Sequence, residues 1–321
     1  MRRRQLIGGI GATVLLAGVA QAQVAGRMYR LGALILSPRD MIDHAVKALE
    51  TSGFVEGRNL MIDADGFGLG VEALDRHAQA LVDAHVDAIW ASGEAPIRAG
   101  LRATRNIPIV AVSEDLVASG FAASLAAPGG NVTGISLLSP ELDGKRLDLF
   151  IDMLPAARRI VALAELAATP PAHIAALQSA AQRRGVELTL EPIKSADDLA
   201  GAFDRTVQAG AGGIIVLASA LLFPLRWRIK DLEAKSHVPV MHGWPATVRA
   251  GGLAGYNADL PQLYRTILAP IMARVLNGEN PGSIPIHQPS TFELVVNLKT
   301  ARALNLVLPD AFLARADEVI E

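Results

Sequence analysis

"PGGNVTGIS", Pro128 to Ser136, stands between two series of apolar, strand-like segments and decides how the chain is divided. Its glycines suggest a phosphate-binding loop, but such a loop follows the first strand of a sheet and opens a helix. This stretch instead precedes an apolar strand, Val132–Ser136, and its glycines are spaced G-G-x-x-x-G. Because proline fixes φ and glycine permits positive φ, we interpret Pro128 to Gly130 as a turn. The strand after it is expected to lead from one lobe toward a second.

Apolar strand-like runs alternate with helix-like periods on both sides of this turn. The runs before it are Tyr29–Leu36, Asn59–Asp65, Val86–Ala91 and Ile107–Val112, with helices expected at about 40–52 and 71–84. The runs after it are Arg159–Leu166, Val186–Glu191, Gly212–Ala218 and Val238–Gly243, with a helix at Pro171–Arg184. Near-continuous apolar strands between helices are typical of parallel sheets covered on both faces. The sequence therefore predicts an α/β protein with two doubly wound, Rossmann-like lobes.

The first residues have the pattern of an export signal. Arg2 to Arg4 form a basic start, Leu6 to Val19 an apolar stretch too short for a comfortable membrane span, and Ala20 to Ala22 a small-residue cleavage site. We predict a signal peptide at residues 1–22 and a periplasmic location. Arg3 and Arg4 partly match a twin-arginine signal, so the general and the twin-arginine export routes both stay open.

The composition excludes several classes of function. The 321 residues contain no cysteine, which excludes a disulfide framework, a thiol nucleophile and a lipid anchor on cysteine. The formal net charge is −2 and no basic run lies outside the signal, so nucleic acid is not an expected partner. The histidines are scattered without metal-ligand spacing, and motifs such as G-x-S-x-G are absent. We therefore expect no enzymatic activity, no metal and no cofactor.

Four stretches resemble one family, the ABC-transporter substrate-binding proteins related to the tryptophan/tyrosine-binding type. They are "SGFVEGRNL" (Ser52–Leu60), "AASLAAPGGNVTGIS" (Ala122–Ser136), "GKRLDLFIDMLP" (Gly144–Pro155) and the C-terminal stretch from Thr291 to Glu321. The resemblance spans Tyr29 to Glu321. It implies a type I periplasmic-binding-protein fold, in which two α/β lobes joined by a three-strand hinge close on one small ligand and are presented to a membrane permease.

Lobe boundaries and departures from the family follow from the same resemblance. We expect lobe 1 at residues 23–136 plus about 258–286, and lobe 2 at 137–257 plus about 287–321. The family usually has "GGDPV" where this chain has "SEDLV" (Ser113–Val117), and often "NPNNPN" where it has "ELAATPP" (Glu165–Pro171). Both stretches are expected at the cleft, so the family's usual ligand does not transfer directly.

In lobe 1, the loops at the carboxyl ends of the strands are where a ligand of an open α/β sheet binds. Ser37 follows the first strand and either meets the ligand or caps a helix. Ser92 and Gly93 follow the third strand at a helix N-terminus, which suits an anionic group. Glu94 beside them is read either as a ligand contact or as favourable charge in the first helical turn.

After the fourth strand, Asp115 matches the Asp of the family's "GGDPV" stretch, so the resemblance makes it the candidate partner for a ligand ammonium group, with Ser113 beside it. The alternative is that Asp115 caps the helix that follows.

In lobe 2, the candidates are Glu165, Ser219, Trp244 and Tyr256. Trp244 offers a large apolar face to a ligand, or packs under its own loop. Tyr256 contributes a ring or hydroxyl, or packs at the hinge.

From these residues we predict a periplasmic solute-binding component of an ABC importer, acting as a monomer. It would capture an amino acid or an aromatic carboxylate and deliver it to a permease. The alternative is a ligand-sensing periplasmic protein that signals to a membrane receptor, because one fold serves both roles.

Overall fold

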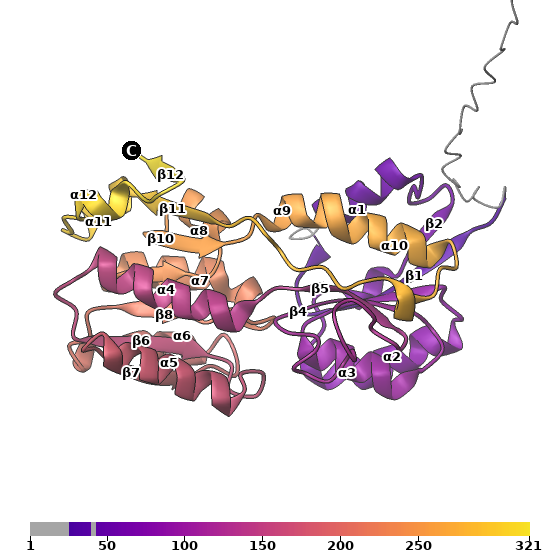
Figure 1. Cartoon of the computed structure of the whole chain (residues 1–321), viewed down its shortest axis with the longest axis horizontal. Coiled ribbons are helices and arrows are strands. Elements are labelled where there is room, and N and C mark those ends of the chain that lie inside the picture. Colours follow the sequence, from indigo (N-terminus) through magenta and orange to yellow (C-terminus); the bar gives the residue numbers. More distant parts are fainter. Residues whose placement is uncertain (1–25, 40–42) are drawn as a thin grey trace, which may run out of the picture.

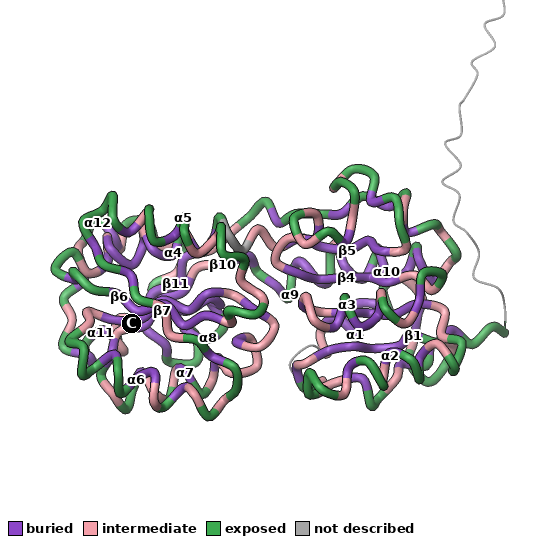
Figure 2. Tube along the Cα trace, turned by 90° about the horizontal axis from the view of Figure 1, so that it is seen from below, coloured by how far each residue is buried: buried purple, intermediate pink, exposed green. Residues whose placement is uncertain are grey.

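The computed structural model describes residues 26–39 and 43–321, and the predicted signal peptide lies outside this part of the chain. The described residues form two α/β lobes that lie side by side along the long axis of the molecule (Figure 1). Each lobe is built around its own sheet. The strands run through the buried centre of each lobe, and exposed residues concentrate on the surrounding helices and loops (Figure 2). Two lobes with doubly wound sheets were predicted, and the structure confirms them.

The first lobe contains a five-stranded, wholly parallel sheet in the order β2-β1-β3-β4-β5. Its strands are β1 (Tyr29–Ile35), β2 (Leu60–Ile62), β3 (Ala88–Ser92), β4 (Ile109–Ser113) and β5 (Val132–Ser136). The second strand is shorter than predicted. Asp63 ends it by accepting the N–H of Asp65 and capping the short helix η3 (Ala64–Gly66).

Helices cover both faces of this sheet because alternate strand residues point to opposite sides. Leu31 and Ala33 of β1 pack on one side with α1 (Asp43–Ala48), η2 (Leu49–Ser52) and α10 (Ala269–Leu276). Leu34 packs on the other side with α2 (Leu74–Asp83), which η4 (Val71–Ala73) precedes, and with α3 (Glu94–Ala103). The near-continuous apolar runs of the sequence are therefore strands buried on both faces.

The second lobe contains a seven-stranded sheet in the order β12-β11-β10-β9-β8-β6-β7. Its strands are β6 (Arg159–Ala164), β7 (Glu187–Pro192), β8 (Ile214–Val216), β9 (Val240–His242), β10 (Ala254–Asn257), β11 (Glu293–Asn297) and β12 (Glu318–Ile320). Its helices are α4 (Ser139–Met153), α5 (Pro171–Arg183), α6 (Asp198–Gln208), α7 (Leu222–Ser236), α8 (Pro245–Arg249), α11 (Leu298–Ala303) and α12 (Asp310–Leu313). All strand pairs are parallel except β10 with β11. That pair is antiparallel because β11 enters the sheet from the other lobe.

The chain crosses between the lobes three times (Figure 1). The first crossing joins β5 to α4, and the second joins β10 to α9 (Leu260–Leu263), which continues through the π-helical turn η5 (Tyr264–Leu268) into α10. The third runs from η6 (Pro281–Ser283) to β11. It lies against β5, since His287 donates its N–H to the Gly134 carbonyl and accepts from the Ser136 N–H, both at 2.9 Å. The crossings therefore lie together as a hinge.

The turn at Pro128 has the predicted role, with one difference. Gly129 has a φ of +79°, as a glycine turn requires, whereas Gly130 does not have positive φ. No helix within residues 26–39 and 43–321 is both long and apolar enough to cross a membrane.

Candidate functional site

A cavity lies between the two lobes, at the carboxyl ends of the parallel strands. Its space, including the part open to solvent, is about 620 Å³. We call it the inner compartment. The first lobe lines it with Ile35, Leu36, Ser37, Trp90, Ser92, Gly93, Val112 and Glu114. The second lobe lines it with Ala218, Ser219, Ala220, Phe223 and Trp244, and the crossing segments add Leu137, Asn257, Leu260 and Tyr264.

Aromatic rings form much of the inner compartment and come from both lobes. Trp90 and Tyr264 meet edge to face with their centroids 6.3 Å apart, and Phe223 and Trp244 meet edge to face at 5.2 Å. The hydroxyl of Tyr264 is hydrogen-bonded to Ser92, and burial raises the pKa of Tyr264 to about 12. Tyr264 is therefore a neutral hydrogen-bonding group in an apolar wall, which suits an apolar ligand body.

The two lobes touch at the N-terminus of α3. Gly93 occupies the N-cap position with a φ of +99°, so no side chain caps the helix. A Cβ atom on Gly93 would stand 2.3 Å from the Cβ of Ala220 in the second lobe. The N–H groups of Glu94 and Ala95 lie in the first turn, where no intrahelical acceptor exists. Together with the helix dipole they favour an anionic group at this point.

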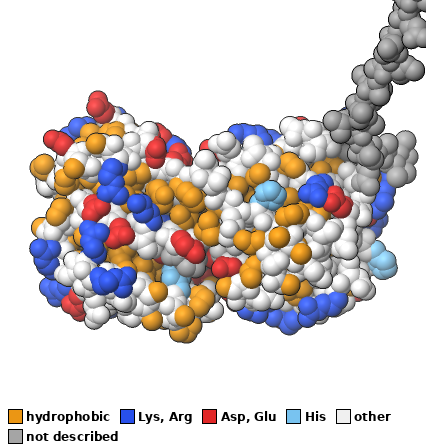
Figure 3. Space-filling view, viewed as in Figure 1, with side chains coloured by type: hydrophobic (Ala, Val, Ile, Leu, Met, Phe, Trp, Pro, Cys, Tyr) orange, Lys and Arg blue, Asp and Glu red, His pale blue; other side chains and the backbone are white. Residues whose placement is uncertain are grey.

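A second cavity, the outer compartment, continues from the first and carries acidic groups. It measures about 580 Å³ including open solvent, and shares Leu36, Glu114 and Ala220 with the inner compartment. Glu94, Glu114 and Glu165 all line it. Figure 3 shows the narrowing between the lobes, with acidic side chains (red) beside it. Arg98 is the single basic residue among its lining, and it is paired with Glu94 at 2.6 Å.

Burial shifts the protonation of two of these carboxyl groups. It raises the pKa of Glu114 to about 7, although the Ser113 hydroxyl donates to this group at 3.1 Å. Burial also raises the pKa of Glu165, which accepts hydrogen bonds from Ser219 and from the Leu221 N–H. The negative charge of Glu165 adds to the shift of Glu114. Two like charges from opposite lobes therefore face each other, and a cation between them would relieve the repulsion.

Seven of the ten residues selected from the sequence line these two compartments. Ser37, Ser92, Gly93, Ser219 and Trp244 lie in the inner one, and Glu94 and Glu165 lie in the outer one. The rule that ligands bind beyond the carboxyl ends of parallel strands thus brings together residues that are far apart in the chain.

The structure places the other three outside both linings. Ser113 is buried and donates to Glu114. Asp115 accepts the N–H groups of Val117 and Ala118, both at 3.0 Å, so its carboxylate caps a turn as in the alternative interpretation. The ring of Tyr256 stacks on Phe292, with centroids 5.9 Å apart, as in the packing alternative.

The sequence interpretation missed Trp90, Glu114, Tyr264 and Asn257 as lining residues. Trp90 is hidden in an apolar strand, and Tyr264 lies in a helix beyond the second crossing. Glu114 had a usable signal, because alternate residues share a face and Val112 also lines the cavity. Its neighbour Asp115 was selected instead, although it faces the other way.

No group of three or more His, Cys, Asp or Glu side chains in the described part of the chain is placed to hold a metal ion. The three glutamates of the outer compartment therefore do not form a metal centre.

Two hinged α/β lobes around a cavity with aromatic walls and an acidic side define a solute-binding protein of the periplasmic type. The chain belongs to the family of ABC transporter substrate binding proteins, whose model matches residues 39–320. The type I periplasmic-binding-protein resemblance drawn from the sequence is thereby confirmed.

Known proteins agree with this assignment. A tyrosine-binding protein of Clostridioides difficile (strain R20291) is 26% identical over 268 residues, which is 81% of this chain and 75% of the relative. A conserved domain protein from Vibrio cholerae has a TM-score of 0.81 at 24% identity, covering 91% of this chain and all of the other. An ABC domain from Streptococcus pneumoniae in complex with L-Trp has a TM-score of 0.79 at 20% identity with the same coverage. The two structures share the fold with this chain.

Proposed function

We propose that this protein is the solute-binding component of an ABC importer and that it captures an amino acid with an apolar side chain. The observation that carries the proposal is the cleft itself, in which aromatic walls from both lobes adjoin carboxylates from both lobes. A ligand with an apolar body and an ammonium group matches both features. The same acidity disfavours the aromatic carboxylate that the sequence left open.

The described residues suggest how such a ligand would be held. Its ammonium group would lie between Glu114 and Glu165, and its carboxylate would meet the N-terminus of α3 at Gly93. Its side chain would lie between Trp244 of the second lobe and Trp90 of the first. Both lobes would contact the bound ligand. Binding would therefore favour the closed arrangement of the lobes, by the difference between the ligand's affinities for the closed and the open state. No bond of the ligand is made or broken.

Family membership supports delivery to a permease of the inner membrane over the sensory alternative. The tyrosine-binding relative and the L-Trp complex support an aromatic amino acid as the ligand. A periplasmic location would follow from the predicted signal peptide at residues 1–22. We propose a monomer for the mature protein, because one chain supplies both walls of the cleft.

Calorimetric titration with three related ligands tests the proposal. L-tryptophan has the apolar body, the ammonium and the carboxylate, tryptamine lacks the carboxylate, and indole-3-propionate lacks the ammonium. We expect L-tryptophan or L-tyrosine to bind, tryptamine to bind more weakly and indole-3-propionate not to bind. At a hundred times its Kd, a true ligand adds about 2.7 kcal/mol to the free energy of unfolding, which thermal melting detects. Equal or tighter binding of indole-3-propionate would contradict the assignment, as would conversion of the ligand during the titration.

A further inference from the structure

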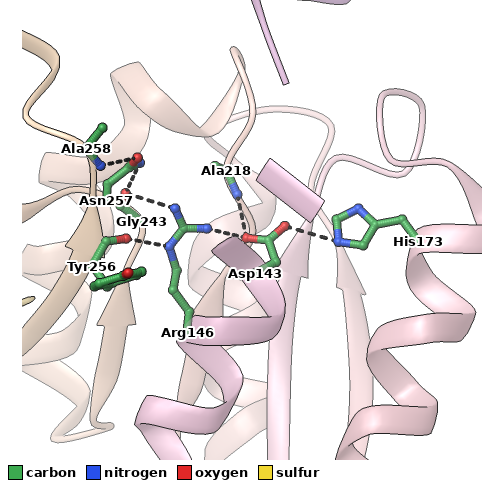
Figure 4. Close-up of polar contacts among 8 residues, drawn as sticks. All are labelled: Asp143, Arg146, His173, Ala218, Gly243, Tyr256, Asn257 and Ala258. Carbon is green, nitrogen blue, oxygen red and sulfur yellow. Dashed lines mark hydrogen bonds and ion pairs between the residues drawn. The ribbon is translucent and has the colours of Figure 1, made fainter. Parts of the chain in front are cut away.

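A buried ion pair on α4 lies behind the second-lobe wall of the cleft and takes no part in lining it. Arg146 and Asp143 are 0% and 1% exposed, and the guanidinium Nη1 bonds to the Asp143 Oδ1. They stand one helical turn apart and point into the lobe (Figure 4). Neither residue belongs to the lining of the inner or the outer compartment.

Arg146 connects two strand ends. Its Nε donates to the Tyr256 carbonyl of β10 at 2.8 Å, and its Nη2 approaches the Gly243 carbonyl after β9 at 3.5 Å. The Gly243 carbonyl also accepts from the Asn257 side chain at 2.6 Å (Figure 4). One guanidinium group thus reaches backbone beside two lining residues, since Trp244 follows Gly243 and Asn257 follows Tyr256.

Asp143 completes the connection at a third strand. Its Oδ1 accepts the N–H of Ala218, which follows β8, at 3.4 Å. Its Oδ2 lies 3.5 Å from the Nε2 of His173 on α5. Ala218 lines the cleft and is followed by Ser219, so the ion pair contacts the ends of three neighbouring strands at the points where they enter the wall.

The ladders of β8 and β9 stop before the wall, whereas Asn257 of β10 is still paired with Glu293. Strands β8 and β9 have three residues each and end at Val216 and His242. Ser219 and Trp244 therefore stand beyond the last paired residue. In the first lobe, by contrast, the lining residue Ser92 is itself paired in the sheet with Ile35 and Val112.

A buried ion pair is a costly way to stabilise a lobe, because desolvation of two charges offsets much of their attraction. Its geometry gives it a different use here. We propose that Arg146 is a positioning residue of the ligand site, which holds the ends of β9 and β10 so that Trp244 and Asn257 stand in the cleft. The expected change in ligand affinity rests on the proposed function. The positioning of the strand ends is independent of which ligand binds.

The test compares Arg146→Lys with a matched control in the same lobe. Lysine keeps the charge but loses the planar fork, so it cannot serve Asp143 and both carbonyls at once. The control is Glu233→Gln, which weakens a buried pair with the His242 ring. The Glu233 carboxylate also accepts the N–H of Val240 at the start of β9 and that of Leu253 just before β10. Both changes disturb a buried polar group of the second lobe, but only Arg146 bonds to backbone carbonyls at the strand ends beside the wall.

The first measurement is hydrogen exchange of the full-length protein without ligand. In Arg146→Lys we expect the amides of residues 218–220, 243–244 and 256–258 to exchange about tenfold faster, the scale of one lost charge-assisted hydrogen bond. In Glu233→Gln these segments keep the wild-type rate. Asp143→Asn, which leaves the carbonyl contacts of Arg146 in place, should speed exchange mainly at 218–220. Faster exchange spread evenly over the second lobe in Arg146→Lys would overturn the inference.

The second measurement is the Kd for L-tryptophan at a temperature where all three proteins are folded. We expect Arg146→Lys to bind about tenfold more weakly and Glu233→Gln to bind within twofold of wild type, even where both melt at similarly lowered temperatures. Equal loss of affinity in the two variants would overturn positioning by Arg146. If wild type does not bind L-tryptophan, the proposed function fails while the exchange result still decides the positioning.

Discussion

The two walls of the cleft are built differently, although both lobes repeat the same βα plan. In the first lobe, β3 and β4 have five residues each, and the lining residues Ser92 and Val112 are paired directly across the sheet. In the second lobe, β8 and β9 are shorter, and Trp244 stands in a loop whose anchor is Arg146 on a helix. One wall is fixed by backbone ladders and the other by a buried side chain.

The two walls of the cleft therefore depend on the sequence in different ways. A ladder needs only strands of sufficient length and apolar character, and these are visible in a short stretch of chain. A loop held by a side chain depends on a residue from a distant segment. Substitutions on the first wall should therefore change ligand binding through steric and charge effects at the substituted residue. Substitutions on the second wall should change ligand binding by displacing loops.

Gly93→Ala should have the largest effect, because it places a methyl group where the two walls meet. The new Cβ would clash with Ala220, and φ at this position is +99°. Overpacking where the lobes meet costs about 3 kcal/mol, so the Kd for L-tryptophan should rise about a hundredfold. The backbone strain is common to the free and bound protein and lowers stability instead. Calorimetric titration measures the change, and small-angle scattering should show the lobes further apart.

A second substitution shows whether the contact between the walls is the cause. Ala220→Gly removes the opposing methyl group, so Gly93→Ala combined with Ala220→Gly should recover part of the affinity. Gly130→Ala is the control, since it is exposed and a Cβ there meets nothing within 4 Å. Equal affinity of Gly93→Ala and wild type would show that the lobes do not need this close approach.

Glu114→Gln should have the next largest effect, and it tests the charge of the first wall. Loss of one charge-assisted contact to the ligand ammonium should raise the Kd about tenfold at pH 8. Because burial raises the pKa of Glu114 to about 7, the wild-type affinity should fall as pH decreases below 7, by about tenfold in all, toward that of the variant. The affinity of Glu114→Gln should change much less over this range. Titration at pH 5, 6, 7 and 8 measures the affinity of wild type and of Glu114→Gln. Parallel pH profiles of the two proteins would contradict a contact between the Glu114 charge and the ligand.

Asp115→Ala should change stability more than affinity, because Asp115 contacts backbone and not the cleft. Loss of its bonds to the Val117 and Ala118 N–H groups should lower the free energy of unfolding by about 1 kcal/mol, the value of a capping side chain. The Kd for L-tryptophan should stay within about twofold of wild type, since the change is below 0.4 kcal/mol. Urea unfolding and titration of the same preparation measure both. A tenfold weaker Kd with unchanged stability would restore Asp115 as the ammonium partner.

The smallest effect concerns the ligand-free protein and its pH dependence. A carboxyl group with a raised pKa in the folded state favours folding when protonated, so its contribution is full below about pH 4.5 and is lost as pH rises through about 7. Its own backbone N–H and the Ser113 hydroxyl stabilise the charged form of Glu114 by donating to it, whereas the charges of Glu165 and Asp143 oppose it. Glu114→Gln imitates the protonated state, so it should melt about 2 °C above wild type at pH 8 and at the same temperature at pH 5.

Glu187→Gln, on the exposed side of β7, is the control for this pH series and should melt like wild type at both pH values. A melting temperature of Glu114→Gln below that of wild type at pH 8 would reverse the sign of the linkage and show that the Glu114 charge is stabilised in the folded protein.

Sequence reasoning selected lining residues of both walls and missed Trp90 and Glu114 of the first. Ser37, Ser92 and Gly93 follow strands that are evident in the sequence, and the strand-end rule placed them at the cleft. Asp115 was selected because it matches the Asp that the family keeps, whereas the directions of Asp115 and its neighbour Glu114 are fixed only by the fold. Trp90 looked like an ordinary core residue, and only the packing of the second lobe over it makes it part of a cavity wall.

The sequence by itself determined the two series of βα units, the turn at Pro128 and the edge of the sheets at which a ligand site forms. These follow from local periodicity and from the shared direction of parallel strands. Only the tertiary structure decided which carboxylates face each other and that α4 anchors the second wall. Arg146 and Tyr256 are 110 residues apart, and Glu114 and Glu165 line one compartment from two lobes, so each residue acquires its role only when folding brings its partner near.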